Sequence, residues 1–221
     1  MARPAIGVMF RREHPPSALP GFARRVEAAG FDELWLVEDC FFAGGFALSA
    51  TALAATERIA VGLGILPGVA RNAAFAAMEI AALAGLHPGR FLPGIGHGVK
   101  DWMRQVGALP VSQLAALEET IAAVRALLRG ETVFAEGRHV RLREVRLDQP
   151  PAEPPPVFAG VMGARSLRLA GRVADGTVLA EGASDAYIQW ARERIAEGTA
   201  EAGRDGPHWV VVYAWCHLDP D

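Results

Sequence analysis

The sequence predicts an α/β fold in one domain, a (β/α)8 TIM barrel that is short of its last βα unit. Short apolar runs alternate with helix-length amphipathic segments along the 221 residues, which is typical of parallel βα units. The first predicted strand runs into Phe10, Arg11 and Arg12, without the phosphate-binding glycine loop of a doubly wound sheet. A complete eight-unit barrel needs about 250 residues, and this sequence ends directly after its seventh predicted core strand.

The first half of the chain contains four predicted strands and three predicted helices. The strands cover residues 6–10, 33–37, 59–66 and 90–96, and the helices cover residues 17–29, 46–56 and 73–84. The third strand is apolar on both faces, which is typical of a strand covered on both sides. Asn72 precedes the third helix as an N-cap, and Gly30 and Gly85 close the first and third helices. These signals predict parallel strands joined by crossover helices.

The second half contains a long helix, an insertion and three more strands. Apolar residues recur at helical spacing from Leu114 to Leu128, so the sequence predicts a helix over residues 112–129. The hydrophobic period then changes, and residues 131–147 are predicted to form an exposed hairpin insertion. Five prolines make residues 149–156 a stiff connector. The remaining predicted strands cover residues 157–161, 176–180 and 209–218, and the remaining predicted helices cover residues 165–173 and 185–202. All these elements are expected to form a single domain of residues 1–221.

Composition and charge exclude several classes of protein. The 22 Lys and Arg residues nearly balance 25 Asp and Glu residues, and without a basic stripe no nucleic-acid partner is expected. The apolar region 59–86 is interrupted by Pro67, Arg71 and Glu79, so no membrane span is predicted. Cys40 and Cys216 lie far apart without metal spacing, which favours a reducing, cytoplasmic setting. The sequence shows neither a His-x-His pair after its first predicted strand nor an acidic cluster at the other strand ends, so no metal site is predicted.

Several motifs occur in a fixed order along the chain. They are AAGFDELW (28–35), VGLGILP (61–67), PGRF (88–91), GIGHG (94–98), GARSLRLAG (163–171) and VADGTVL (173–179). In this order they resemble the bacterial-luciferase-like family of flavin- and deazaflavin-dependent oxidoreductases. The resemblance covers nearly the whole chain and implies a TIM barrel with an insertion after the fourth strand. Family members usually continue past a strand like residues 209–218 with a helix, an eighth strand and a final helix, which this sequence lacks.

Glycines at the carboxyl end of the fourth strand form the first candidate site. Gly94, Gly96 and Gly98 alternate with Ile95 and His97 at the active face of such a barrel. Missing side chains there let a flat ring or a phosphate approach the backbone. On spacing alone, a tight turn with a solvent-facing His97 is the preferred explanation, because such short glycine repeats are common. The resemblance favours a cofactor role for Gly96, His97 and Gly98, with His97 donating a hydrogen bond to a phosphate or ribityl oxygen.

Glycines within the third strand form the second candidate site. Gly62 and Gly64 each weaken a buried strand, because they offer no side chain to pack. Two interpretations remain open, a bulky group that packs against them or a close approach of helix and strand. The resemblance places a bulge at Gly64 and Ile65, often with a cis peptide bond, that supports the central ring of the flavin.

The loop before the helix over residues 165–173 is the third candidate site. Free backbone N–H groups at the start of a helix attract anions. In the resembled family the corresponding loop receives the cofactor phosphate, which assigns Met162, Gly163 and Ala164 to phosphate binding. Arg165 either adds positive charge to this site or is a solvated helix residue.

Asp39 and Cys40 end the second strand on the active face and are the catalytic candidates. An acid among apolar residues needs a partner, so we expect Asp39 to contact cofactor or substrate. Cys40 is also explained as a small apolar filler. Relatives often carry a histidine near this point, which the segment from Glu38 to Phe42 lacks, so the resemblance transfers no catalytic acid or base.

Two functional hypotheses follow. The resemblance implies an oxidoreductase that transfers a hydride with the deazaflavin coenzyme F-420, or that acts with FMN as a monooxygenase on a small organic substrate. It also implies a homodimer, for which the helix over residues 112–129 and the early Ala-rich helices offer a face. The missing last unit and the missing histidine support the alternative, a truncated non-catalytic barrel that acts as a binding or dimer-scaffold subunit.

Overall fold

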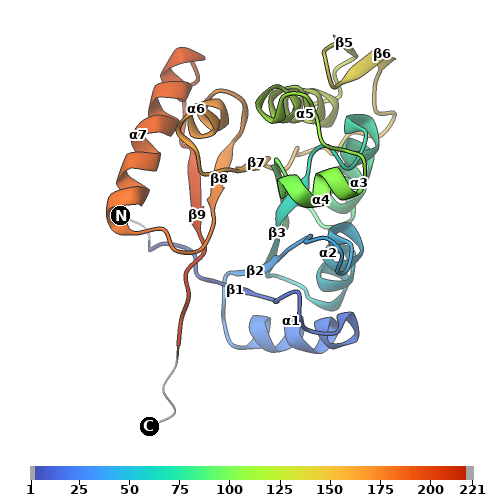
Figure 1. The fold of residues 1–221 in the computed structure, drawn as a ribbon. Coiled ribbons are helices and arrows are strands. Elements are labelled where there is room, and N and C mark those ends of the chain that lie inside the picture. The colour runs from blue at the N-terminus through green and yellow to red at the C-terminus, as the bar shows by residue number, and fades with distance from the viewer. Residues whose placement is uncertain (1–2, 218–221) are drawn as a thin grey trace.

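The computed structural model describes residues 3–217, and its main sheet is parallel and seven-stranded. The strands are β1 (Gly7–Met9), β2 (Glu33–Leu36), β3 (Ala60–Pro67), β4 (Phe91–Gly96), β7 (Phe158–Gly160), β8 (Gly176–Leu179) and β9 (Trp209–Val212). They lie in the order β1-β2-β3-β4-β7-β8-β9, and the sheet curls into part of a barrel (Figure 1). The predicted fold class, an incomplete α/β barrel, is therefore confirmed.

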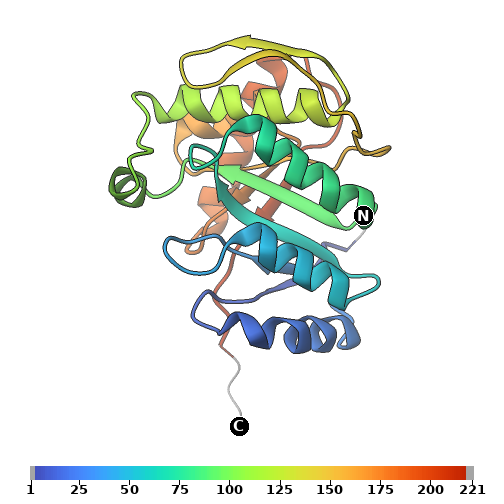
Figure 2. The ribbon, with the colours of Figure 1, turned by 90° about the vertical axis from the view of Figure 1, so that its right-hand side faces the viewer.

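Helices cover the outer face of this sheet. They are α1 (Leu19–Ala28), α2 (Gly45–Ala55), α3 (Ala73–Leu86), α5 (Gln113–Leu128), α6 (Ala164–Val173) and α7 (Asp185–Glu201). A 3-10 turn η1 (Pro16–Ala18) precedes α1, and the short helix α4 (Lys100–Gln105) lies in the connection after β4. Figure 2 shows α1, α2, α3 and α5 in succession along this face. The main core lies between sheet and helices, where Leu36, Leu63, Ile80 and Ile121 are fully buried.

Side-chain caps define where several helices begin. The side chain of Asn72 accepts a hydrogen bond from Ala74 N at the start of α3, as the sequence predicts. Ser112 and Ser184 cap α5 and α7 in the same way. In contrast, α6 begins after Gly163, which has no side chain to cap the helix. The first N–H groups of α6 therefore stay open to a ligand or to water.

The inner face of the sheet carries a separate aromatic cluster. Its buried members are Trp35, Leu92, Phe158 and Val178. The Trp35 ring meets the rings of Phe158 and Tyr213 edge-on, with centroids 6.1 and 5.8 Å apart. A Cβ at Gly62 would overlap the Trp35 ring. Gly62 is thus explained by close packing within the barrel.

A hairpin lies outside the barrel, next to α5. Its strands β5 (Val133–Glu136) and β6 (Arg141–Val145) pair antiparallel and form the edge of the molecule beyond α5 (Figure 2). The Glu119 carboxylate of α5 accepts hydrogen bonds from the backbone N–H groups of Arg138, His139 and Val140. One carboxylate therefore holds the turn of the hairpin against the helix.

Two elements differ from the sequence prediction. The helix α4 was not predicted, because six residues are too few to show a helical period. The last strand was predicted over residues 209–218 but ends at Val212. Its partner β8 ends at Leu179, which pairs with Val212, so no strand is left for the later residues to pair with. Leu218 lies outside the described residues. None of the helices within residues 3–217 is long and apolar enough to cross a membrane.

Candidate active site

The loops that follow neighbouring strands meet at the carboxyl edge of the sheet. Pro67 of β3 pairs with Gly96 of β4, and Gly96 pairs with Gly160 of β7. The segments 96–98 and 162–164 therefore emerge side by side at this edge. Asp39 and Cys40 leave the sheet at the same edge, two strands away from β4.

Gly64 and Ile65 lie deeper in the barrel than the other candidates. The peptide bond between them is cis, and the pairing of β3 with β4 shifts register here, as the resemblance implies. A Cβ at Gly64 would overlap the Tyr213 hydroxyl, and burial raises the pKa of that hydroxyl. A Cβ at Gly96 would lie 2.7 Å from Ile65 Cδ1. The bulky groups against these glycines are thus Tyr213 and Ile65 of this chain, and a cofactor contact at Gly64 and Ile65 stays a prediction.

His97 is partly buried and joins three elements. Its Nδ1 lies 3.1 Å from the carbonyl oxygen of Gln113 on α5, and its Nε2 lies 3.0 Å from Ser166 Oγ on α6. Burial lowers the pKa of His97, against the opposing effect of the Gln113 carbonyl. The interpretation of His97 as a solvent-facing turn residue is therefore wrong. Gly98 makes the turn itself, with φ +70°.

The start of α6 has the features of an anion site. Gly163 occupies the N-cap with φ −79° and ψ 150°, and nothing lies within 4 Å of the position where a Cβ would be. The N–H groups of Ala164 and its neighbours have no helical carbonyl to bind. Met162 is exposed, and its carbonyl accepts a hydrogen bond of 2.7 Å from the Tyr187 hydroxyl of α7. The donor set and the open space fit a phosphate group.

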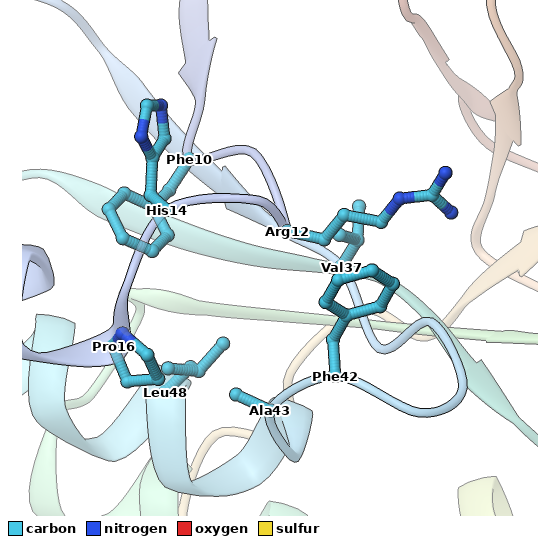
Figure 3. Close-up of a pocket in the computed structure, with 8 residues that line it drawn as sticks. All are labelled: Phe10, Arg12, His14, Pro16, Val37, Phe42, Ala43 and Leu48. Atoms are coloured by element: carbon cyan, nitrogen blue, oxygen red, sulfur yellow. The ribbon is translucent and has the colours of Figure 1, made fainter.

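Asp39 already has a partner within the chain. Its Oδ2 lies 2.7 Å from Arg12 Nη1, and the Arg12 guanidinium lies 5.2 Å from the Phe42 ring centroid. Figure 3 shows Arg12 and Phe42 beside each other, on the loops after β1 and β2. The hollow between these loops has a volume of about 10 Å³, roughly that of one water. Burial, with Glu38 and Asp39 nearby, raises the pKa of Cys40, so its thiol stays protonated at neutral pH.

Glu38 lies directly before the candidates Asp39 and Cys40 and was not predicted as a candidate from the sequence. Its carboxylate accepts hydrogen bonds from Arg71 at 2.5 and 3.0 Å and from Gly45 N at 2.6 Å, and its side chain is only 10% exposed. The Arg71 guanidinium also lies over the Phe46 ring. This ion pair joins the loops after β2 and β3 to the start of α2. An acid at the end of a buried strand needs a partner, and this holds for Glu38 as well as for Asp39.

Residues 3–217 hold no group of three or more His, Cys, Asp or Glu side chains placed to bind a metal ion. A cavity of about 220 Å³ lies on the outer side of the barrel, between the start of α3, residues 107–110, α5 and His139 of the hairpin. Its lining includes the loop of Gly68 and Arg71 after β3 and residues 107–110 of the connection after β4, but none of the candidate residues 39–40, 64–65, 96–98 or 162–164. The candidate residues therefore belong to the edge of the sheet and not to this outer cavity.

Fold and site together define a βα-barrel protein with an uncapped helix start at the carboxyl edge of its sheet. The luciferase-like monooxygenase family matches residues 2–221, and the chain belongs to this family. Its relatives include the 5,10-methylenetetrahydromethanopterin reductase of Methanolobus tindarius, which is 29% identical over 97% of this chain and 66% of the relative. The F420-dependent glucose-6-phosphate dehydrogenase of Nakamurella multipartita is 30% identical over 86% of this chain and 60% of the relative. The chain thus spans less than two thirds of the length of these relatives.

Solved structures share the fold. The coenzyme F420-dependent tetrahydromethanopterin reductase from Methanopyrus kandleri superposes with a TM-score of 0.85 at 23% identity, over 96% of this chain and 66% of that chain. The oxygenating constituent of 3,6-diketocamphane monooxygenase from Pseudomonas putida, in complex with FMN, superposes with a TM-score of 0.77 at 18% identity, over 93% and 66%. These similarities confirm the luciferase-like barrel fold.

Proposed function

We propose that this chain is an oxidoreductase of the luciferase-like family that binds a phosphate-bearing cofactor of the flavin type and acts on a small organic substrate. The uncapped start of α6 beside His97 carries this proposal, because its N–H groups fit a phosphate and a glycine leaves the approach open. Met162, Gly163 and Ala164 would hold the phosphate. Gly96 and Gly98 would let the cofactor approach the backbone after β4.

Coenzyme F-420 is the cofactor that we favour over FMN. Relatives whose names include F420 are 28–31% identical to this chain, whereas the FMN complex shares only the fold at 18% identity. When bound, coenzyme F-420 exchanges a hydride with the substrate, whereas FMN supports monooxygenation. The chain itself binds the cofactor, orients the substrate and excludes water from the site. The ion pair of Glu38 and Arg71 would fix the loops around the cofactor.

The cytoplasmic location of the protein stays a prediction.

The catalytic candidates have unequal support. Asp39 is about a third exposed at the mouth of the barrel, where its carboxylate can face a substrate while Arg12 holds it in place. Cys40 is half-buried and protonated, so it is a poor nucleophile without an activating base. We therefore propose Asp39, oriented by Arg12, as the residue that contacts the substrate.

We also propose that the chain forms a homodimer through α3. This helix exposes Phe75, Met78 and Leu86, whose side chains are 64%, 53% and 73% exposed. The three residues recur at spacings of three and eight along α3, so they share one side of the helix. An apolar stripe of this kind is typical of a surface that a second copy covers.

Parallel fluorescence titrations with coenzyme F-420 and FMN test the cofactor proposal. We expect micromolar binding of coenzyme F-420. Gly163→Asp places a carboxylate at the N-cap, where it binds the open N–H groups and repels phosphate. We expect this variant to lose at least tenfold in affinity. Gly163→Ala is the matched control, because its backbone angles and open space suit alanine.

The outcomes of these titrations discriminate the two hypotheses. Equal affinity of the folded Gly163→Asp variant and the unsubstituted chain would remove the phosphate assignment. Binding of FMN alone would replace hydride transfer by monooxygenation. A cooperatively folded chain that binds neither cofactor would support the alternative, a non-catalytic barrel that serves as a binding or scaffold subunit.

A further inference from the structure

His97 lies at the junction of β4, α5 and α6. Its two ring nitrogens contact Gln113, the first residue of α5, and Ser166, the third residue of α6. Side chains in a helix lean toward its N-terminus. The Ser166 hydroxyl therefore belongs to the same turn as the open N–H groups of Ala164 and Arg165. A group that binds those N–H groups is within the reach of this hydroxyl.

The direction of both hydrogen bonds follows from proton counting. The carbonyl of Gln113 can only accept, so Nδ1 of His97 carries a proton. Because burial lowers the pKa of His97, the ring is neutral at pH 7 and Nε2 has a lone pair. The Ser166 hydroxyl must then donate to Nε2. In this state only lone pairs of Ser166 face outward, and they repel an anion.

No charged side chain in the described chain contacts the His97 ring. Its hydrogen-bond partners are Gln113 and Ser166, and its pKa is set by burial and by the Gln113 carbonyl. The charged residues of α4, α5 and α6 do not contribute to the pKa shift of His97; they are Lys100, Asp101, Arg104, Glu118, Glu119, Arg125, Arg165, Arg168 and Arg172. An anion at the start of α6 would thus be the dominant new charge close to the ring.

We infer that His97 is a positioning residue that turns Ser166 into a phosphate ligand when the ring takes up a proton. With a proton on Nε2, His97 donates to Ser166 Oγ, and the hydroxyl hydrogen is free to point at the phosphate. The phosphate in turn stabilises the charged ring. Anion binding and proton uptake therefore favour each other by the same factor. The inference rests on the proposed function, since it needs a cofactor phosphate at α6.

Calorimetric titration at pH 6 in two buffers of different ionisation enthalpy measures the protons taken up per cofactor bound. The ligands are coenzyme F-420 and its 8-hydroxy-5-deazariboflavin fragment, which lacks the phosphate. Both carry the same ring hydroxyl, so titration of the ring system cancels between them. The phosphodiester of coenzyme F-420 keeps its charge in this range. We expect more proton uptake with coenzyme F-420 than with the fragment.

Two substitutions at Ser166 localise the effect. Ser166→Ala should abolish the extra proton uptake and weaken binding of coenzyme F-420 by about tenfold, while affinity for the fragment stays the same. Ser166→Thr keeps the hydroxyl and should retain both properties. A second readout needs no cofactor. Long-range nitrogen–proton NMR of the free chain should show the Nδ1-protonated neutral tautomer of His97.

The possible failures are distinguishable. If coenzyme F-420 and the fragment bind with equal proton uptake, or if Ser166→Ala keeps the extra uptake, the inference is wrong and the proposed function stands. An Nε2-protonated tautomer in the free chain would also overturn it. If neither coenzyme F-420 nor the fragment binds the folded chain, the proposed function and this inference fail together.

Discussion

His208 and Thr177 form a polar pair beside the core that ties β9 to β8. Nε2 of His208 lies 2.8 Å from Thr177 Oγ1, and Thr177 is fully buried. Burial lowers the pKa of His208 to about 4, with a further lowering by Arg204 and an opposing effect of Asp175. The folded chain therefore holds this imidazole in its neutral form.

We expect this histidine to make the fold sensitive to acid. In the unfolded chain the pKa of His208 is about 6.5, so between pH 6.5 and 4 the unfolded chain binds more protons than the folded one. Stability is thus present above pH 6.5 and is lost as the pH falls toward 4. Between pH 7 and 5 the loss is about 1–2 kcal/mol. Urea unfolding at both pH values measures it, and His208→Gln should flatten the difference. An equal pH dependence in the variant would assign the effect to other residues.

At the scale of single residues, the sequence predicts where site residues lie better than what they contact. The positions of Gly96, Gly98 and Gly163 at the carboxyl edge follow from strand ends, which the sequence marks clearly. The contacts of His97 with α5 and α6 cannot be predicted in this way, because the partner residues are 16 and 69 positions away in the sequence. The pairing of Glu38 with Arg71 was missed for the same reason, a separation of 33 residues.

Among the elements, the hairpin β5–β6 depends on one carboxylate of α5. Three consecutive backbone N–H groups at its turn donate to Glu119, and these hydrogen bonds, against the effect of burial, lower its pKa. We expect Glu119→Ala to free the turn without unfolding the barrel. Hydrogen exchange at residues 138–140 should accelerate at least tenfold, with a loss of about 1 kcal/mol in global stability.

Glu118→Ala is the matched control for this substitution. Glu118 lies on the same helix and pairs with Arg172 of α6 at 3.2 Å, away from the hairpin. Its removal should leave exchange at residues 138–140 unchanged. Unaltered exchange in Glu119→Ala would show instead that apolar contacts, such as those of the buried Val140 and Leu142, hold the hairpin alone.

Element boundaries also show what the sequence can and cannot determine. Each strand of the barrel was predicted within about one residue at most ends, because apolar runs and glycine stops mark them locally. The end of β9 was not predicted correctly, since it is set by the length of its partner β8. The short α4 has no period of its own, and its buried Met103 packs near Gly98, a contact that only the folded chain creates.

Across the whole molecule, the two faces of the sheet are packed in different ways. Helices bury the outer face, and aromatic side chains such as Trp35 and Phe158 fill the inner one. The outer side of α3 takes part in neither layer, and its Phe75 and Met78 are 64% and 53% exposed. Phe75 and Met78 therefore have no packing role within the described chain, and a second copy is the simplest way to cover them.

The dimer proposed through α3 predicts a change of mass on substitution. The chain has a mass of 23.5 kDa, and we expect light scattering after size exclusion to give twice this value. Replacing Phe75 and Met78 by Glu places four charges in the interface of two copies and should give the monomer mass with unchanged circular dichroism. Phe134→Glu is the control, because Phe134 is also exposed, at 70%, but belongs to β5 of the hairpin and not to α3. A monomer before substitution, or a dimer that survives both charges, would show that α3 is not the contact between copies.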